Sequence, residues 1–142
     1  MEENNDVIVF EDFLTERKIT IGLNIHGQFV SSFSGKGFSI IEENNLVSLL
    51  RLLEIDFSIF IKKIAELIKE FNSQSPMIKA ELDGFPSREI VKLALSGDRD
   101  YWVELSLPWV LKMGQRYFSQ EIIGISRNKK IGQKTRHKQV NY

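Results

Sequence analysis

The sequence predicts an α+β fold in which an N-terminal antiparallel β-meander is followed by a mostly helical C-terminal part. Apolar and polar residues alternate within residues 18–33, a period-two pattern typical of half-buried strands. Residues 57–71 instead place their apolar side chains at the spacing of one helical stripe. The chain has 142 residues, of which 42% are hydrophobic and ten are phenylalanine, so it can bury a core without disulfides.

The meander is predicted from three short strands and the turns between them. The first strand lies within residues 18–25, and Gly27 supplies a residue that accepts the positive φ of a turn. Residues 28–33 then return as the partner strand. After the glycine-containing stretch 34–37, residues 38–41 form a third strand.

The segment before the meander has two open interpretations. Residues 7–10 could pair with the edge of the sheet as a further strand. Alternatively, residues 11–17 could form a short helix. The residue pattern does not choose between the two.

Three helices are predicted in the middle of the chain. Asn44 or Asn45 caps the first, which is apolar nearly all round and ends near Glu54. The second follows Asp56, another residue that favours helix caps, and carries the apolar stripe described above. The third spans residues 87–95 and ends at a Ser-Gly pair.

The remaining segments have weaker patterns. Residues 77–83 alternate enough to indicate a short strand. Residues 101–107 fit a strand or a helix; the neighbouring helices favour a helix, although Pro108 would disturb a continuous one. Residues 113–126 are expected to continue helically, with inward side chains at Tyr117, Phe118, Ile122 and Ile125.

The charged residues are unequally distributed along the chain. All nineteen acidic residues lie at or before Glu121, whereas residues 122–142 contain no acid and six cations. The formal net charge of zero is therefore a cancellation between a body near −6 and a tail near +6. We expect residues 1–126 to form a single globular domain and residues 127–142 to form a basic C-terminal tail.

Composition excludes several classes of protein. Because the chain contains no cysteine, disulfides, thiolate zinc sites and cysteine nucleophiles are excluded. The anionic start at residues 1–6 lacks the cationic and apolar regions of a signal peptide. No apolar stretch reaches the roughly 18 residues of a membrane span. We therefore expect a cytoplasmic protein that does not bind membranes.

Catalytic and metal-binding motifs are not found. His26 lies in a predicted turn and His137 in the basic tail, whereas a histidine metal site needs two or three converging ligands. The loop at residues 34–37 is a poor match to a phosphate-binding loop, because Val30 and Gly37 stand where that motif requires glycine and serine or threonine. No catalytic residue, metal or cofactor is predicted.

Paired acidic residues in predicted loops are the first candidates for partner binding. Glu42 and Glu43 follow the third predicted strand, and Asp98 and Asp100 follow the third predicted helix. Acid catalysis would require carboxylates held in an apolar cleft, which loops of this composition do not provide. If the pairs share one face, they would attract a cationic partner and raise the rate and selectivity of association.

A dense aromatic group forms the second set of candidates. It contains Tyr101, Trp102, Trp109, Tyr117 and Phe118. Tryptophan and tyrosine are enriched at binding hot spots, but they are also ordinary core residues. A core role is favoured for the group as a whole, with Trp102 or Trp109 as the member most expected at a binding surface.

The basic tail provides the third set of candidates, for nucleic-acid contact. Clustered cations suit phosphate groups. The interleaved aromatic residues that stack on bases are absent, except for Tyr142. A solvated extension, or a tail docked on the acidic body, are the alternatives. The candidate residues are Lys129, Lys130, Lys134, Arg136 and Lys138.

These features together predict a non-catalytic protein-binding module whose acidic body binds a cationic partner, such as a basic toxin or nuclease. In size, acidic body and lack of catalytic residues the chain resembles bacterial immunity and antitoxin proteins. That resemblance is one of general character, so it transfers no residue roles. The alternative prediction is a nucleic-acid-associated accessory protein that uses the basic tail. An enzyme of unfamiliar type is the third hypothesis.

Overall fold

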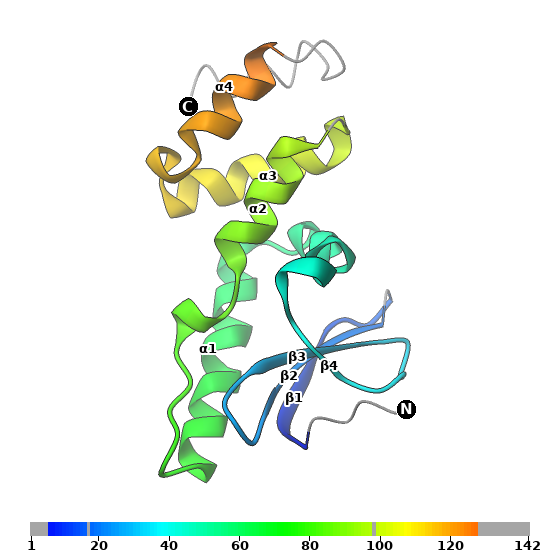
Figure 1. Ribbon diagram of the computed structural model, residues 1–142, viewed down its shortest axis with the longest axis vertical. Helices are drawn as coiled ribbons and strands as arrows, with labels where there is room; N and C mark the ends of the chain where they lie inside the picture. The colour runs from blue at the N-terminus through cyan, green and yellow to red at the C-terminus, as the bar shows by residue number, and fades with distance from the viewer. Residues whose placement is uncertain (1–5, 17, 98, 128–142) are drawn as a thin grey trace. The chain divides into compact units, whose positions relative to one another are not determined.

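The computed structural model describes residues 6–16, 18–97 and 99–127, which contain an N-terminal sheet followed by helices (Figure 1). The predicted α+β class is therefore confirmed. Most of the predicted basic tail lies outside the described residues, so the domain and tail boundaries stay predictions. By their contacts, the residues group into two compact units. Unit 1 lies within Met1–Asn45 and Ser58–Pro86, and unit 2 lies within Leu46–Phe57 and Ser87–Tyr142.

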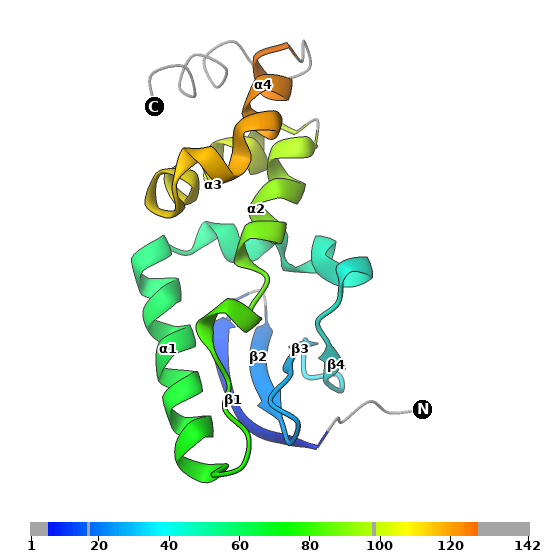
Figure 2. The same ribbon diagram turned by 60° about the vertical axis from the view of Figure 1, so that its left-hand side comes forward.

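Unit 1 is built on a four-stranded antiparallel sheet in the order β1-β2-β3-β4, which confirms the predicted meander. Ile19, Ile21 and Leu23 of β2 are almost fully buried, so the period-two pattern marks the core face. Helix α1 lies alongside the sheet (Figure 2). The elements of unit 1 are β1 (Val7–Leu14), β2 (Ile19–Asn24), β3 (Phe29–Phe33), β4 (Ser39–Ile40), α1 (Phe57–Gln74, whose first residue belongs to unit 2) and the short 3-10 helix η2 (Leu82–Gly84).

Strand β1 resolves the open choice at the N-terminal segment in favour of the strand. It continues as far as Leu14, so no helix forms over the part of residues 11–17 that the structure describes. Glu11 pairs with Ile21 across the sheet, and Lys63 of α1 neutralises its carboxylate at 3.2 Å. This ion pair explains how a charged residue occupies a strand position beside a buried isoleucine.

The turn between β2 and β3 forms where it was predicted, and the buried Asn24 holds it. The side-chain oxygen Oδ1 of Asn24 accepts the backbone N–H groups of His26 (2.9 Å) and Gln28 (3.0 Å). Gly27 has φ +75°, as a residue without a side chain readily does. His26 is exposed in this turn.

Helix α1 confirms the predicted apolar stripe. Phe60, Ile64, Leu67 and Phe71 are buried at a spacing of three or four residues. Within unit 1 the Phe60 ring meets the rings of Phe13 and Phe85, with centroids 5.6 and 5.3 Å away. These aromatic contacts join helix α1 to strand β1, through Phe13, and to the end of η2, through Phe85.

The strand predicted at residues 77–83 does not form. The segment is irregular up to η2, and its backbone bonds to a side chain instead of a neighbouring strand. The Asn72 side chain accepts the N–H of Ala80 (2.8 Å) and donates to the carbonyl of Ala80 (3.2 Å). The weak alternation of residues 77–83 therefore reflects a segment held against helix α1.

Unit 2 is helical. The predicted helix ending at Glu54 is present as the 3-10 helix η1, whose three-residue repeat places Leu46, Leu49 and Leu52 in one buried row. Helix α2 contacts α3 and α4. The elements are η1 (Glu43–Glu54, in unit 2 from Leu46 on), α2 (Ser87–Ser96), α3 (Asp100–Met113), η3 (Gln115–Phe118) and α4 (Ser119–Arg127).

Helix α3 settles the ambiguity at residues 101–107 in favour of a helix. It runs through Pro108, which is exposed and lacks the N–H that an interior helical residue supplies. The next residue, Trp109, anchors this turn, because its indole N–H donates to the carbonyl of Ile55 at 3.2 Å. Phe118 and Ile125 are buried, as predicted for the last helical segment.

Replacement of Asn72 by alanine should destabilise unit 1. The variant leaves the N–H and C=O of the buried Ala80 without their partners, which costs about 1–3 kcal/mol for such a group. Urea denaturation followed by circular dichroism measures the change. S73A, on the next and exposed residue of α1, is the matched control and should stay within about 0.5 kcal/mol of the wild type. Equal stability of the two variants would contradict the role of Asn72.

Two glycine-to-alanine substitutions should have opposite effects. A Cβ at Gly22 of β2 would lie 2.6 Å from the Val9 carbonyl oxygen, so G22A forces the strands apart and should cost about 1–3 kcal/mol. Gly124 in helix α4 has open space around its missing Cβ, and G124A should stabilise by about 1 kcal/mol. Thermal melts of both variants test the pair. A shift of the same sign in both would refute the steric explanation.

Candidate functional site

A surface cluster in unit 2 joins η1 to the start of helix α3. The three-residue repeat of η1 places Arg51 and Glu54 in one row that faces away from the buried leucines. Tyr101 and Trp102 lie in the first turn of α3. We call these four residues, Arg51, Glu54, Tyr101 and Trp102, the Glu54 cluster.

One carboxylate oxygen connects the Glu54 cluster. The Tyr101 hydroxyl donates to Glu54 Oε2 at 2.6 Å, and Arg51 Nη1 donates to the same oxygen at 3.2 Å. The Tyr101 and Trp102 rings meet edge to face with centroids 4.7 Å apart. The Arg51 guanidinium lies 5.7 Å from the centroid of the Trp102 ring. Each member of the cluster thus contacts at least one other.

The hydrogen bond from Tyr101 contributes more to the cluster than the ion pair does. Hydrogen bonds to charged groups contribute about 1.5–3 kcal/mol, whereas exposed ion pairs contribute about 0–1 kcal/mol. The Arg51 side chain is 44% exposed and that of Glu54 17% exposed, so solvent screens their attraction. Tyr101 therefore fixes the Glu54 carboxylate, and Arg51 remains available at the surface.

Acidic residues lie beside the Glu54 cluster on helix α3. Asp100, Tyr101 and Glu104 are all exposed, and Glu104 lies three residues after Tyr101 and four after Asp100, so it neighbours both on the helix surface. The exposed side of this first turn therefore carries two carboxylates and a tyrosine. Such a surface can bind a cationic group by charge and by aromatic contact.

The structure separates the two tryptophan candidates. Trp102 is partly exposed and belongs to the Glu54 cluster. Trp109 is 1% exposed, and its ring contacts Phe57 with centroids 5.1 Å apart. Trp109 is therefore a core residue, since its buried indole bonds a backbone carbonyl, and we do not retain it as a partner-binding residue.

The acidic candidates fall in different parts of the chain. Asp100 is exposed in unit 2, and Asp98 lies outside the described residues. Glu42 and Glu43 are exposed in unit 1, where Asn45 holds their turn by accepting the N–H of Glu42 at 2.9 Å. The tail candidates Lys129, Lys130, Lys134, Arg136 and Lys138 also lie outside the described residues.

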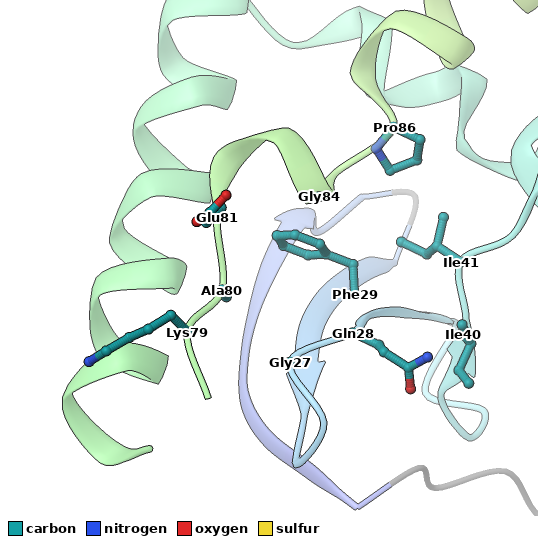
Figure 3. Close-up of a pocket in the computed structure, with 10 residues that line it drawn as sticks. All are labelled: Gly27, Gln28, Phe29, Ile40, Ile41, Lys79, Ala80, Glu81, Gly84 and Pro86. Carbon is teal, nitrogen blue, oxygen red and sulfur yellow. The ribbon is translucent and has the colours of Figure 1, made fainter. Parts of the chain in front are cut away.

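Unit 1 contains a hollow of about 420 Å³ that sequence patterns did not indicate (Figure 3). Its apolar wall comes from the start of β3 and from the residues around β4. The opposite wall is the irregular segment that Asn72 holds, and Figure 3 shows the Lys79 side chain extending away from the apolar residues. The ten lining residues are Gly27, Gln28, Phe29, Ile40, Ile41, Lys79, Ala80, Glu81, Gly84 and Pro86.

The hollow has few polar side chains. Its lining offers one amide (Gln28), one amine (Lys79) and one carboxylate (Glu81), but no hydroxyl or imidazole side chain. Amine and carboxylate groups both occur in acid–base and nucleophilic mechanisms, so this lining by itself assigns no chemistry to the hollow. Sequence patterns did not predict the hollow because residues 27–29, 40–41 and 79–86, which line it, are separated in the sequence and come together only in the folded unit.

A second cluster in unit 2 contains Arg88, Arg116 and Tyr117. The Arg88 guanidinium lies 3.8 Å from the centroid of the Tyr117 ring, and Arg116 Nη2 donates to the Tyr117 hydroxyl at 3.3 Å. The hydrogen bond from Arg116, followed by the positive charges of Arg116 and Arg88, lowers the pKa of Tyr117 below its ordinary value. We call this group the Arg88 cluster.

Two further properties bear on the range of possible chemistry. Within the described ranges, no three His, Cys, Asp or Glu side chains gather closely enough to hold a metal ion. No helix of the described part of the chain combines the length and apolar character that crossing a bilayer requires.

No family model, curated protein or solved structure matches this chain.

The pKa of Tyr117 should rise when Arg116 is replaced by glutamine. A phenol whose pKa is lowered in the folded state ionises at lower pH than an ordinary tyrosine, near pH 10. The ionised Tyr117 side chain stabilises the folded state fully above the ordinary tyrosine pKa, and this contribution is lost as pH falls through the lowered pKa of Tyr117. At neutral pH Tyr117 is protonated, so R116Q should not change the free energy of unfolding through this group. The difference in phenolate absorbance between wild type and R116Q, followed during an alkaline titration, isolates Tyr117 from the other two tyrosines. Superimposable titrations would contradict the assignment.

Proposed function

We propose that this chain is a non-catalytic protein-binding module that recognises a cationic region of another protein through the Glu54 cluster and the adjacent acidic residues. The observation that carries the proposal is the partly buried Glu54 carboxylate, fixed by the hydroxyl of the exposed Tyr101 beside Trp102 and Arg51. Trp, Tyr and Arg are the residue types that dominate binding hot spots. All three occur here, because Tyr101 and Arg51 both bind Glu54 and Trp102 contacts each of them.

Preorganisation supports binding at this cluster. A side chain that is already held in place loses little conformational freedom when a partner docks, and each rotamer-rich side chain that must be immobilised costs about 0.5–1.5 kcal/mol. Tyr101 is held by Glu54 and by Trp102, although it is 53% exposed. The cluster therefore offers aromatic area to a partner at low entropic cost.

Charge supports a cationic partner. Asp100 and Glu104 flank Tyr101 on the exposed side of α3, and the chain up to Glu121 carries an excess of six acids over cations. Complementary charge of this kind raises the association rate and discriminates between partners. A cationic toxin or nuclease would fit, as in bacterial immunity and antitoxin proteins. The absence of cysteine is the reason to place this binding in the cytoplasm.

Glu42 and Glu43 provide a second acidic location on unit 1. Glu42 lines a hollow of about 440 Å³ with Ser39, Ile40, Asn44 and Asn45. No aromatic residue lines this hollow, so it lacks the hot-spot residue types of the Glu54 cluster. We therefore propose that Asp100 and Glu104 make the principal acidic contacts and that Glu42 and Glu43 contribute to long-range attraction.

Charge reversal on α3 should weaken partner binding. The D100K/E104K variant places two cations beside Tyr101, and we expect about a tenfold loss of affinity through charge repulsion. Tagged wild type and variant would be used to capture a partner from the native host at low and moderate salt. The affinity of the captured partner for each variant would then be measured by calorimetry.

Two matched variants locate the effect. E66K/E70K makes the same charge change on two exposed residues of α1 in unit 1, and we expect it to bind nearly as the wild type does. E42K/E43K tests the other predicted acidic pair, and we expect it to slow association with a small change in affinity. Binding by D100K/E104K at wild-type strength would refute the proposal, as would an equal loss in E66K/E70K.

A further inference from the structure

The Arg88 cluster brings two like charges to one tyrosine on the surface of unit 2. Arg88 lies over the Tyr117 ring at 3.8 Å, and the Arg116 guanidinium lies 5.2 Å from the same ring centroid. Both arginines are exposed, and Tyr117 is partly exposed. The shared ring keeps the two cations close together although α2 and η3 are distant in sequence.

Within the described part of the chain, no carboxylate neutralises either guanidinium at ion-pair distance. Arg88 is also the second residue of helix α2, where the helix dipole already contributes positive potential. A basic residue is disfavoured at that end of a helix. Glu89 is the acidic residue of this turn, so the two arginines and the helix end keep an excess of positive charge that a bound anion would lower.

The geometry leaves hydrogen-bond donors available for an anion. A guanidinium that stacks on a ring keeps its N–H groups in its own plane, pointing past the ring edge. Arg116 uses Nη2 to bind the Tyr117 hydroxyl, and a guanidinium has five N–H donors in total. Both arginines can thus still make the forked contacts that suit phosphate oxygens.

The surrounding charges favour a polyanion over a single small anion. Lys92 is exposed one turn after Arg88 on the same helix. Glu121 of α4 lines a hollow with Ser96, at the other end of α2 from Arg88. In sequence, Arg127 at the end of α4 is followed by residues 128–142, which hold five cations and no acid.

We propose that Arg88, Arg116 and Tyr117 form a site for the phosphodiester backbone of a nucleic acid. This site differs from the Glu54 cluster in its residues and in the sign of its charge. The proposal is independent of the protein partner proposed above. Phosphate contacts of this type position a nucleic acid without reading its sequence. Lys92 extends the site along α2.

Fluorescence anisotropy with a labelled DNA duplex tests the proposal on the full chain. We expect the wild type to bind at low salt and R88Q/R116Q to bind on the order of tenfold more weakly. The slope of log affinity against log salt should fall by about 1.8, since each duplex phosphate contact contributes about 0.9. The conservative R88K/R116K variant should keep the slope but lose several-fold in affinity, because lysine cannot make forked contacts.

K62Q/K69Q, which removes two exposed charges from α1 in unit 1, is the matched control and should keep wild-type affinity. Circular dichroism checks that each variant folds, and R116Q alone, at an exposed residue, replaces the double variant if that fails to fold. Absence of wild-type binding at low salt would overturn the proposal, as would an equal loss in K62Q/K69Q. Binding to phosphatidylglycerol vesicles or to a phosphopeptide in place of DNA would also overturn it.

Discussion

The three-residue repeat of η1 is the constraint on which unit 2 depends. A 3-10 helix superimposes every third side chain, so Leu46, Leu49 and Leu52 form one buried row. The same repeat superimposes Arg51 on Glu54, which form an ion pair at 3.2 Å. In an α-helix each third side chain would be displaced by about 60° around the axis, so neither row would stay on one face. One backbone geometry therefore supplies both the leucine core of unit 2 and half of the Glu54 cluster.

Asparagine side chains have the corresponding role in unit 1. An asparagine amide has the same donor and acceptor as a peptide group, so it can replace a neighbouring strand where none is present. Asn72 does this for Ala80, Asn24 for the β2–β3 turn, and Asn45 for Glu42 and for the carbonyl of Ile40. These three residues hold the irregular segments of unit 1, including one wall of the hollow in Figure 3.

Sequence periodicity predicted the elements whose own residues decide their structure. The meander and helix α1 follow from apolar spacing within single segments. Strand β1 extends to Leu14 because it pairs with β2 as far as Ile19, and the backbone of residues 77–83 bonds to the side chain of Asn72 in place of a strand. Trp102 or Trp109 was predicted at a binding surface, but the hydrogen bond from Tyr101 to Glu54 was not predicted, because these two residues are 47 residues apart. Contacts of this kind leave no periodic signal in a single sequence.

The two clusters of unit 2 differ in how their charges are satisfied, and that difference separates the partners that we propose for them. In the Glu54 cluster the carboxylate already has two donors, and the exposed Tyr101 ring offers aromatic area. Binding there should depend moderately on salt, since much of it comes from desolvated rings. In the Arg88 cluster the aromatic ring is already covered by a guanidinium, and unneutralised charge remains. A ligand there must supply negative charge, and its affinity must fall steeply with salt. The salt dependence of any partner that this chain captures therefore indicates which cluster holds it.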